Sequence, residues 1–109
     1  MIEIEAVLDE NRVLRSCKAS GHAGLGRTGT DIVCAAVSVL MRTAVRSLNG
    51  REGITLQWEA PEPGLLSLEA EYTTEGRDFL FAAGVFLIEG LSSVAEEYPE
   101  HCKLTIRRK

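Results

Sequence analysis

The chain has 109 residues, of which 45% are hydrophobic and 26% charged, and its formal net charge is −4. This length and balance predict a single globular domain over residues 1–109, large enough to bury a core without disulfide staples. The mild negative charge argues against a general nucleic-acid binder, because neutralising phosphates takes clustered lysine and arginine.

Targeting signals are not evident in the sequence. No run of about 18 apolar residues is present, so we expect no membrane-spanning helix. The first ten residues carry acids where a secretory signal would carry positive charge. We therefore expect a cytoplasmic protein with no membrane partner. Its three cysteines, Cys17, Cys34 and Cys102, should then be reduced, and their odd number argues against a disulfide framework.

The N-terminal segment predicts a β-hairpin. Residues 1–8 alternate apolar and acidic side chains, the pattern of a strand with one solvated face. Residues 9–11, Asp-Glu-Asn, are turn formers, and residues 13–19 continue less regularly as a second strand. Residues 21–29 are rich in glycine and are predicted to form a loop.

A helix is predicted next, capped by Thr30 or Asp31 and ending near Leu48. Asn49 and Gly50 are residues that stop helices. Apolar residues recur at the three- and four-residue spacing of a buried stripe. The stripe consists of Val33, Ala36, Val37, Leu40, Ala44 and Leu48.

Residues 54–58 and 66–72 alternate as two further strands, joined through the proline- and glycine-containing residues 61–64. A second helix is predicted from Gly76 or Arg77 to Tyr98. Its expected stripe is Phe79, Ala83, Phe86, Leu87, Leu91 and Val94, and Phe81, Val85 and Ile88 lie off that stripe. A helix with so much apolar surface is covered on two sides or meets a partner.

A last strand is predicted over residues 102–106. The predicted order is therefore strand-strand-helix-strand-strand-helix-strand. Amphipathic strands with helices between them indicate an α+β two-layer sandwich, in which one mostly antiparallel or mixed sheet carries both helices on one face.

The glycine-rich loop has three alternative interpretations, and the first is a phosphate cradle. Residues 24–29, Gly-Leu-Gly-Arg-Thr-Gly, match G-x-G-x-x-G between a strand and a helix. However, the chain is short for a doubly wound dinucleotide domain, and its strands come as hairpins. No Lys-Ser or Lys-Thr follows the glycines, so the P-loop pattern is absent as well. Nucleotide binding is therefore the weaker alternative.

The second interpretation is a metal site built from His22, Cys34, Cys17, His101 and Cys102. None of these residues shows the short paired spacing of structural zinc ligands. We expect no metal, and we interpret Cys17 and Cys102 as small strand hydrophobes and His101 as a surface residue.

The third interpretation is a thiol nucleophile at Cys34, which the predicted cap places in the first turn of the helix. Free N–H groups and the helix dipole favour a thiolate there. His22 lies on the loop and can fold back as its base. The same N–H groups can hold the oxyanion of a tetrahedral intermediate. A buried small cysteine is the alternative for Cys34.

Two neighbours of Cys34 have open roles. Asp31 either orients His22 or only caps the helix. Ser38 lies one turn after Cys34 on the same face, where it can bond near the site or back to a helix carbonyl.

The residues around the loop resemble a known family. Residues 21–23, Gly-His-Ala, followed by residues 29–38, Gly-Thr-Asp-Ile-Val-Cys-Ala-Ala-Val-Ser, resemble the signature of the ribosomal-processing cysteine protease family, Prp. The late Glu-Glu-Tyr of residues 96–98, the last strand and the total length are also similar to that family. The resemblance thus covers nearly the whole chain.

The resemblance implies a cytoplasmic thiol protease, a peptide hydrolase of ribosome biogenesis. Such proteins remove a short N-terminal extension from a bacterial large-subunit ribosomal protein, whose precursor is their peptide substrate. The family's catalytic dyad matches Cys34 and His22, and its supporting Asp and Ser match Asp31 and Ser38. The resemblance further implies a homodimer, no cofactor and no direct nucleic-acid partner.

The resemblance also implies that the loop between the dyad residues is flexible and admits the peptide. The loop residues are Gly21, Gly24, Gly26, Arg27, Thr28 and Gly29. The rival hypothesis is a non-catalytic module that associates with RNA or assembling ribosomes, for which Cys34 would be dispensable.

Overall fold

The computed structural model describes residues 1–21, 28–62 and 64–109, without the side chains of residues 28–31 and 62. The predicted order of elements is confirmed. The elements are β1 (Ile2–Leu8), β2 (Leu14–Ser20), α1 (Thr28–Leu48), β3 (Ile54–Glu62), β4 (Leu65–Tyr72), α2 (Arg77–Glu97) and β5 (Cys102–Arg108).

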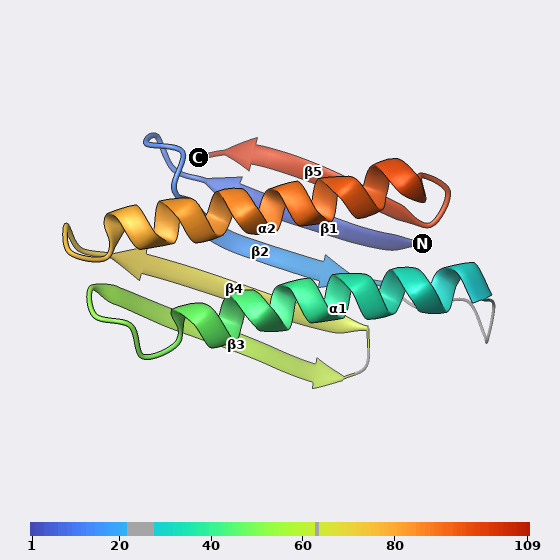
Figure 1. Ribbon diagram of the computed structural model, residues 1–109, viewed down its shortest axis with the longest axis horizontal. Helices are drawn as coiled ribbons and strands as arrows, with labels where there is room; N and C mark the ends of the chain where they lie inside the picture. The colour runs from blue at the N-terminus through green and yellow to red at the C-terminus, as the bar shows by residue number, and fades with distance from the viewer. Residues whose placement is uncertain (22–27, 63) are drawn as a thin grey trace.

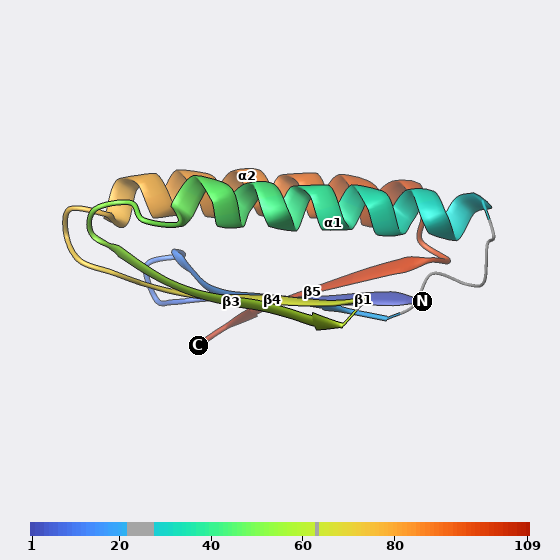
Figure 2. The ribbon, with the colours of Figure 1, turned by 90° about the horizontal axis from the view of Figure 1, so that it is seen from below.

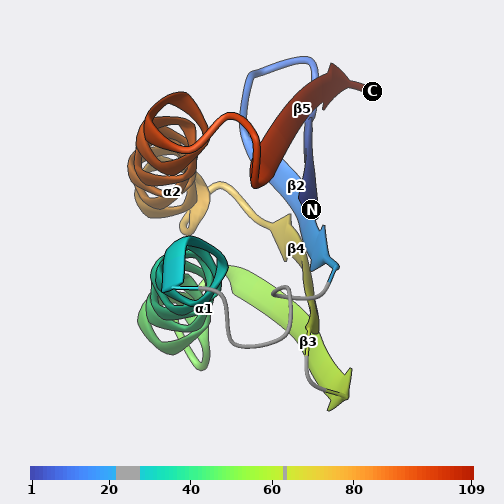
Figure 3. The ribbon, with the colours of Figure 1, turned by 90° about the vertical axis from the view of Figure 1, so that its right-hand side faces the viewer.

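The strands form one mixed sheet in the order β3-β4-β2-β1-β5. β1 and β2, β2 and β4, and β3 and β4 pair antiparallel, whereas β1 and β5 pair parallel. Figure 1 shows α1 and α2 side by side and running in opposite directions. Both helices lie on one face of the sheet, and the other face is left open (Figures 2 and 3). The predicted α+β two-layer architecture is therefore confirmed.

The core lies between the sheet and the helices. Ile2, Ile4 and Ala6 of β1 are buried under the helices, whereas Glu3 and Glu5 between them are exposed on the open face. This is the period-two pattern that the sequence predicted. Full burial of each large aliphatic side chain contributes roughly 1.5–3 kcal/mol.

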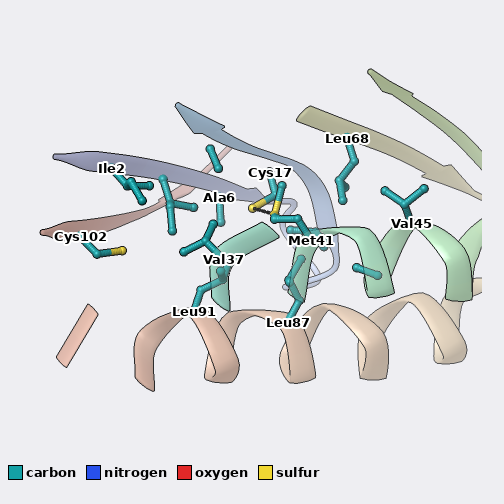
Figure 4. Close-up of a cluster of buried hydrophobic side chains, with 14 of the residues drawn as sticks. Ile2, Ala6, Cys17, Val37, Met41, Val45, Leu68, Leu87, Leu91 and Cys102 are labelled. Carbon is teal, nitrogen blue, oxygen red and sulfur yellow. Dashed lines mark hydrogen bonds between the residues drawn. The ribbon is translucent and has the colours of Figure 1, made fainter. Parts of the chain in front are cut away.

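The helices complete this core from the other side. Figure 4 shows Val37 and Met41 of α1, and Leu87 and Leu91 of α2, directed into the same cluster. The Cys17 thiol donates to the Met41 sulfur at 3.5 Å inside it. Cys17 is thus a small core residue of β2, as the sequence analysis expected.

The start of α1 differs from the prediction. The helix begins at Thr28, so Thr28 and Gly29 belong to the helix, and Thr30 and Asp31 lie inside its first turn instead of capping it. Glycine is an unfavourable residue in a helix, by about 1 kcal/mol relative to alanine, so local preference pointed to a start after Gly29. The correction moves Cys34 from the first turn into the second.

The buried stripe of α2 was predicted only in part. Leu87 and Leu91 are buried as predicted, but Leu80 and Gly84 are buried as well, and Phe86, assigned to the core, is 74% exposed. Gly84 explains part of the difference, because a Cβ at this position would lie 2.9 Å from the Leu14 Cβ. The helix packs closely against β2 at this glycine. A pattern of apolar side chains cannot indicate that a glycine is buried, because glycine has no side chain.

One helix among the described residues, α2, is long and apolar enough to cross a membrane by length and composition alone. The expectation of no such helix therefore fails on those two criteria. The core helix of a soluble protein meets the same criteria, and Leu80, Leu87 and Leu91 pack into the two core clusters. Only 22% of its most apolar 18-residue stretch is buried, so α2 also carries an apolar outer surface.

The turn between β1 and β2 is organised by Asp9. Its Oδ1 accepts hydrogen bonds from the backbone N–H groups of Asn11 at 2.8 Å and Val13 at 3.0 Å. The Tyr72 hydroxyl donates to its Oδ2 at 2.5 Å. Burial alone would raise the pKa of Asp9, but these hydrogen bonds and the charge of Arg15 lower it below the ordinary value of 3.8.

We expect Asp9→Asn to lower the free energy of unfolding at pH 7 by about 1 kcal/mol, the typical loss for one hydrogen bond. Because the folded pKa is lowered, the contribution of the carboxylate is present above pH 3.8 and is lost as pH falls through the folded value. The free energy of unfolding, measured by urea melts at pH 7 and pH 3, should therefore change less between the two pH values for Asp9→Asn than for the native chain. Glu10→Gln, on the same turn but exposed, is the control; an equal loss in both variants would contradict the prediction.

Candidate active site

A groove of about 630 Å³ opens at one end of the molecule. In Figure 1, the end of β2 and the first turns of α1 lie at this side of the molecule. The end of β3 and the start of β4 lie there as well. The lining is mostly apolar. It consists of Ile2, Ala19, Ser20, Gly21, Cys34, Ala35, Val37, Ser38, Met41, Arg42, Ala60, Pro61, Gly64, Leu65 and Leu66.

Cys34 and Ser38 both line this groove, four residues apart on one face of α1. Both side chains are half-buried. The structure therefore brings these two predicted residues together at an open cavity. The alternative of a fully buried cysteine does not hold for Cys34.

The position of Cys34 changes the expected source of oxyanion donors. Cys34 follows Thr28, the first residue of α1, by six positions. Only the first four N–H groups of a helix lack partners within it, so the Cys34 N–H is beyond them. Helical side chains lean toward the N-terminus, which directs the Cys34 sulfur back toward that first turn.

Gly21 forms a fixed point in the groove wall. Its N–H donates to the Gly64 carbonyl at 3.0 Å, and its φ is 128°, in the region that favours glycine. A Cβ at this position would overlap the Met1 carbonyl oxygen. Gly21, assigned to the flexible loop, is thus an anchored residue directly after the end of β2.

The remaining site predictions lie outside the described residues. These are His22, Gly24, Gly26 and Arg27, together with the side chains of Thr28 and Asp31. The pairing of Cys34 with His22, the role of Asp31 and the flexible substrate loop therefore stay predictions.

The other two cysteines are buried away from the groove. Cys17 is 0% exposed and Cys102 is 2% exposed. Burial raises the pKa of Cys17 to about 12 and also raises the pKa of Cys102. Both are therefore thiols at neutral pH and are protected from reagents in solution.

We expect iodoacetamide at pH 7.5 to alkylate Cys34 at least about ten times faster than Cys17 or Cys102, because thiolate fraction and access set the rate. Peptide mapping by mass spectrometry at short times measures the three sites in one sample. In denaturant, the three cysteines should be alkylated at equal rates. Equal rates in the folded chain would contradict the burial difference.

Part of the groove could not be predicted from the sequence. Pro61, Gly64 and Leu66 belong to β3, β4 and their connection, and Ile2 belongs to β1. No local pattern indicated that these residues meet α1. Arg42 carried one usable signal, because it follows Cys34 and Ser38 at the same four-residue spacing.

A metal centre has no support in the described part of the chain. Within residues 1–21, 28–62 and 64–109, no group of three or more His, Cys, Asp or Glu side chains is placed to hold a metal ion. His101 is half-buried just before β5.

One family model matches most of the chain. It is described as cysteine protease Prp and matches residues 1–103. The crystal structure of SMU.848 from Streptococcus mutans is 28% identical, with a TM-score of 0.83, and the match covers 100% of this chain and 96% of that chain. No curated protein matches the chain significantly.

Two further structures share the fold. A crystal structure of the essential ribosomal processing protease Prp from S. aureus with a substrate peptide is 20% identical, with a TM-score of 0.81 and coverage of 97% and 99% of the two chains. A second structure of that protease, with a covalently linked product peptide, is 21% identical, with the same TM-score and coverage.

Proposed function

The chain belongs to the Prp family of cysteine proteases, and on this basis we propose that it removes a short N-terminal extension from a bacterial large-subunit ribosomal protein. The proposed catalytic dyad is Cys34 and His22, with Asp31 and Ser38 in support. The proposed place of action is the cytoplasm, during ribosome assembly. Two structural neighbours are described as a ribosomal processing protease with bound peptide, which supports this substrate class.

In the proposed mechanism, the Cys34 sulfur attacks the scissile carbonyl carbon and its proton passes to His22. The carbonyl oxygen becomes an oxyanion, which the unpartnered N–H groups of the first turn of α1 stabilise. His22 then protonates the leaving amine, and the C–N bond breaks to give a thioester. Water, deprotonated by His22, hydrolyses the thioester and restores the thiol.

The observation that carries this proposal is the exposure of one sulfur to a groove large enough for peptide side chains. Cys34 is half-buried at the groove, whereas Cys17 and Cys102 are enclosed in the core. The rival binding module gives no reason for a thiol at this position. It predicts that Cys34→Ala retains function and that salt strongly weakens binding.

The test is incubation of the purified chain with the precursor and mature forms of the ribosomal protein, followed by intact-mass spectrometry. We expect a single mass loss in the precursor, equal to its extension, and none in the mature form. The control is Cys34→Ser, which should leave both masses unchanged. An intact precursor, or cleavage by Cys34→Ser, would contradict the proposal.

We also propose that the protein acts as a homodimer, joined through the outer surface of α2. Phe81, Val85 and Phe86 are 40%, 46% and 74% exposed on this helix. Contiguous exposed apolar surface of this kind is typical of protein interfaces. Large aromatic side chains at the centre of an interface contribute much of its stability.

We expect Phe86→Glu to weaken self-association at least about 30-fold, because an exposed charge replaces an interface anchor. Sedimentation velocity over a concentration series measures the change. Arg46→Glu, exposed on α1, is the control and should associate normally. A monomeric native chain at all concentrations, or an unchanged Phe86→Glu dimer, would contradict the proposed interface.

A further inference from the structure

Arg42 stands apart among the residues that line the groove. Of the described lining residues it is the one with a charged side chain, and the others are apolar or small and neutral. It follows Cys34 and Ser38 at four-residue intervals, so the three residues share one face of α1. A cation is therefore placed on the same wall as the candidate nucleophile, two turns further along.

The spacing translates into a position along a bound peptide. At 1.5 Å per residue, the backbone of Arg42 lies about 12 Å from that of Cys34 along the helix axis. An extended peptide advances about 3.4 Å per residue. A peptide that follows α1 through the groove therefore reaches Arg42 about three or four residues from its scissile bond.

The chemistry of the groove defines what Arg42 can recognise. A guanidinium presents a planar fork of N–H donors that matches a carboxylate in two parallel hydrogen bonds. The surrounding walls, which include Pro61, Leu65 and Leu66, are apolar. Arg42 itself is exposed at the mouth of the groove, so water weakens an ion pair between its guanidinium and a peptide carboxylate, and the pair remains modest.

We propose that Arg42 is a specificity-determining residue, which selects peptides that carry an acidic side chain three or four residues from the scissile bond. The inference rests on the proposed proteolytic function of the groove. Partly exposed ion pairs are modest, so the expected preference for Glu over Gln at that position is about threefold to tenfold. It should decline with added salt, because screening weakens the attraction.

The kinetic test uses decapeptides that span the cleavage site of the ribosomal precursor, each with one position set to Glu or to Gln. The native chain should show a kcat/KM ratio of threefold or more at one position, three or four residues from the cut. Arg42→Gln should reduce this ratio to about one, and Arg42→Glu should favour Lys there. Arg46→Gln, the same change on the same helix outside the groove lining, should keep the native ratio.

A binding measurement separates this inference from the proposed function. Cys34→Ala and the double variant Cys34→Ala/Arg42→Gln are titrated with the same peptides labelled with fluorescein, and anisotropy reports Kd. Tighter binding of the Glu peptide by Cys34→Ala alone supports the inference even if no peptide is cleaved. Equal affinities for Glu and Gln at every position, or a preference that survives Arg42→Gln, would overturn it while leaving Cys34-dependent cleavage untouched.

Discussion

Cys34→Ala is expected to lower kcat/KM for a precursor peptide by about 10⁴-fold or more, since loss of a catalytic nucleophile removes the covalent pathway. His22→Ala should cause a loss of about 10³-fold or more, because the thiol then lacks a base and the leaving amine lacks an acid. The double variant should be no slower than the slower single variant. Such strong non-additivity is the signature of residues that act as one unit.

The controls for this experiment are Cys102→Ala and His101→Ala, which remove the same functional groups away from the groove. Both should retain kcat/KM within about threefold, although Cys102→Ala leaves a small gap in the core and lowers stability. Continuous assays with a fluorogenic peptide measure all the variants at one pH. Additive losses in the double variant would contradict a dyad, and a native rate for Cys34→Ala would contradict thiol catalysis altogether.

Gly21→Ala is expected to lower kcat/KM by about 10²-fold and the free energy of unfolding by roughly 1–3 kcal/mol. The added methyl group would overlap the Met1 carbonyl oxygen, and φ of 128° is strained for any residue with a side chain. Either the strand β1, which carries Ile2 of the groove, or the backbone of residue 21 must move. Residue 22 follows directly, so the displacement reaches the proposed base.

The control is Gly50→Ala, which separates strain from position. Gly50 also has a positive φ, of 76°, but a Cβ there meets no atom within 4 Å. Left-handed backbone strain of about 1–2 kcal/mol should therefore lower stability without changing kcat/KM. Urea melts and peptide kinetics on both variants give the two readouts. If Gly21→Ala lost no more activity than Gly50→Ala, Gly21 would have only a structural role.

Much of the fold was accessible from local patterns. The alternation over residues 1–8 fixes which side chains of β1 enter the core, because successive side chains of a strand point to opposite faces. The glycine at position 50 marked the end of α1, and its φ is positive as a helix stop requires. The stretch around Cys34 indicated both the family and the residue that lies at the groove.

The errors arose where a local pattern was used alone. Helix propensity ranked Gly29 as a poor helix residue, yet α1 includes it. The count of apolar residues placed Phe86 in the core, whereas the buried face of α2 depends on a residue distant in sequence, through the approach of Gly84 to Leu14. A local pattern carries no information about such a partner.

By itself, the sequence determined the order of the elements, the solvated face of the sheet and the residue type that performs the proposed chemistry, since each follows from periodicity or from a contiguous motif. Only the tertiary structure decided that Cys34 faces a groove, that Gly21 is fixed against β1 and that Arg42 also lines that groove. The physical reason is that periodicity is a property of the local backbone. A groove is formed by strands and helices that meet through packing, and no segment of the chain encodes its partner's position.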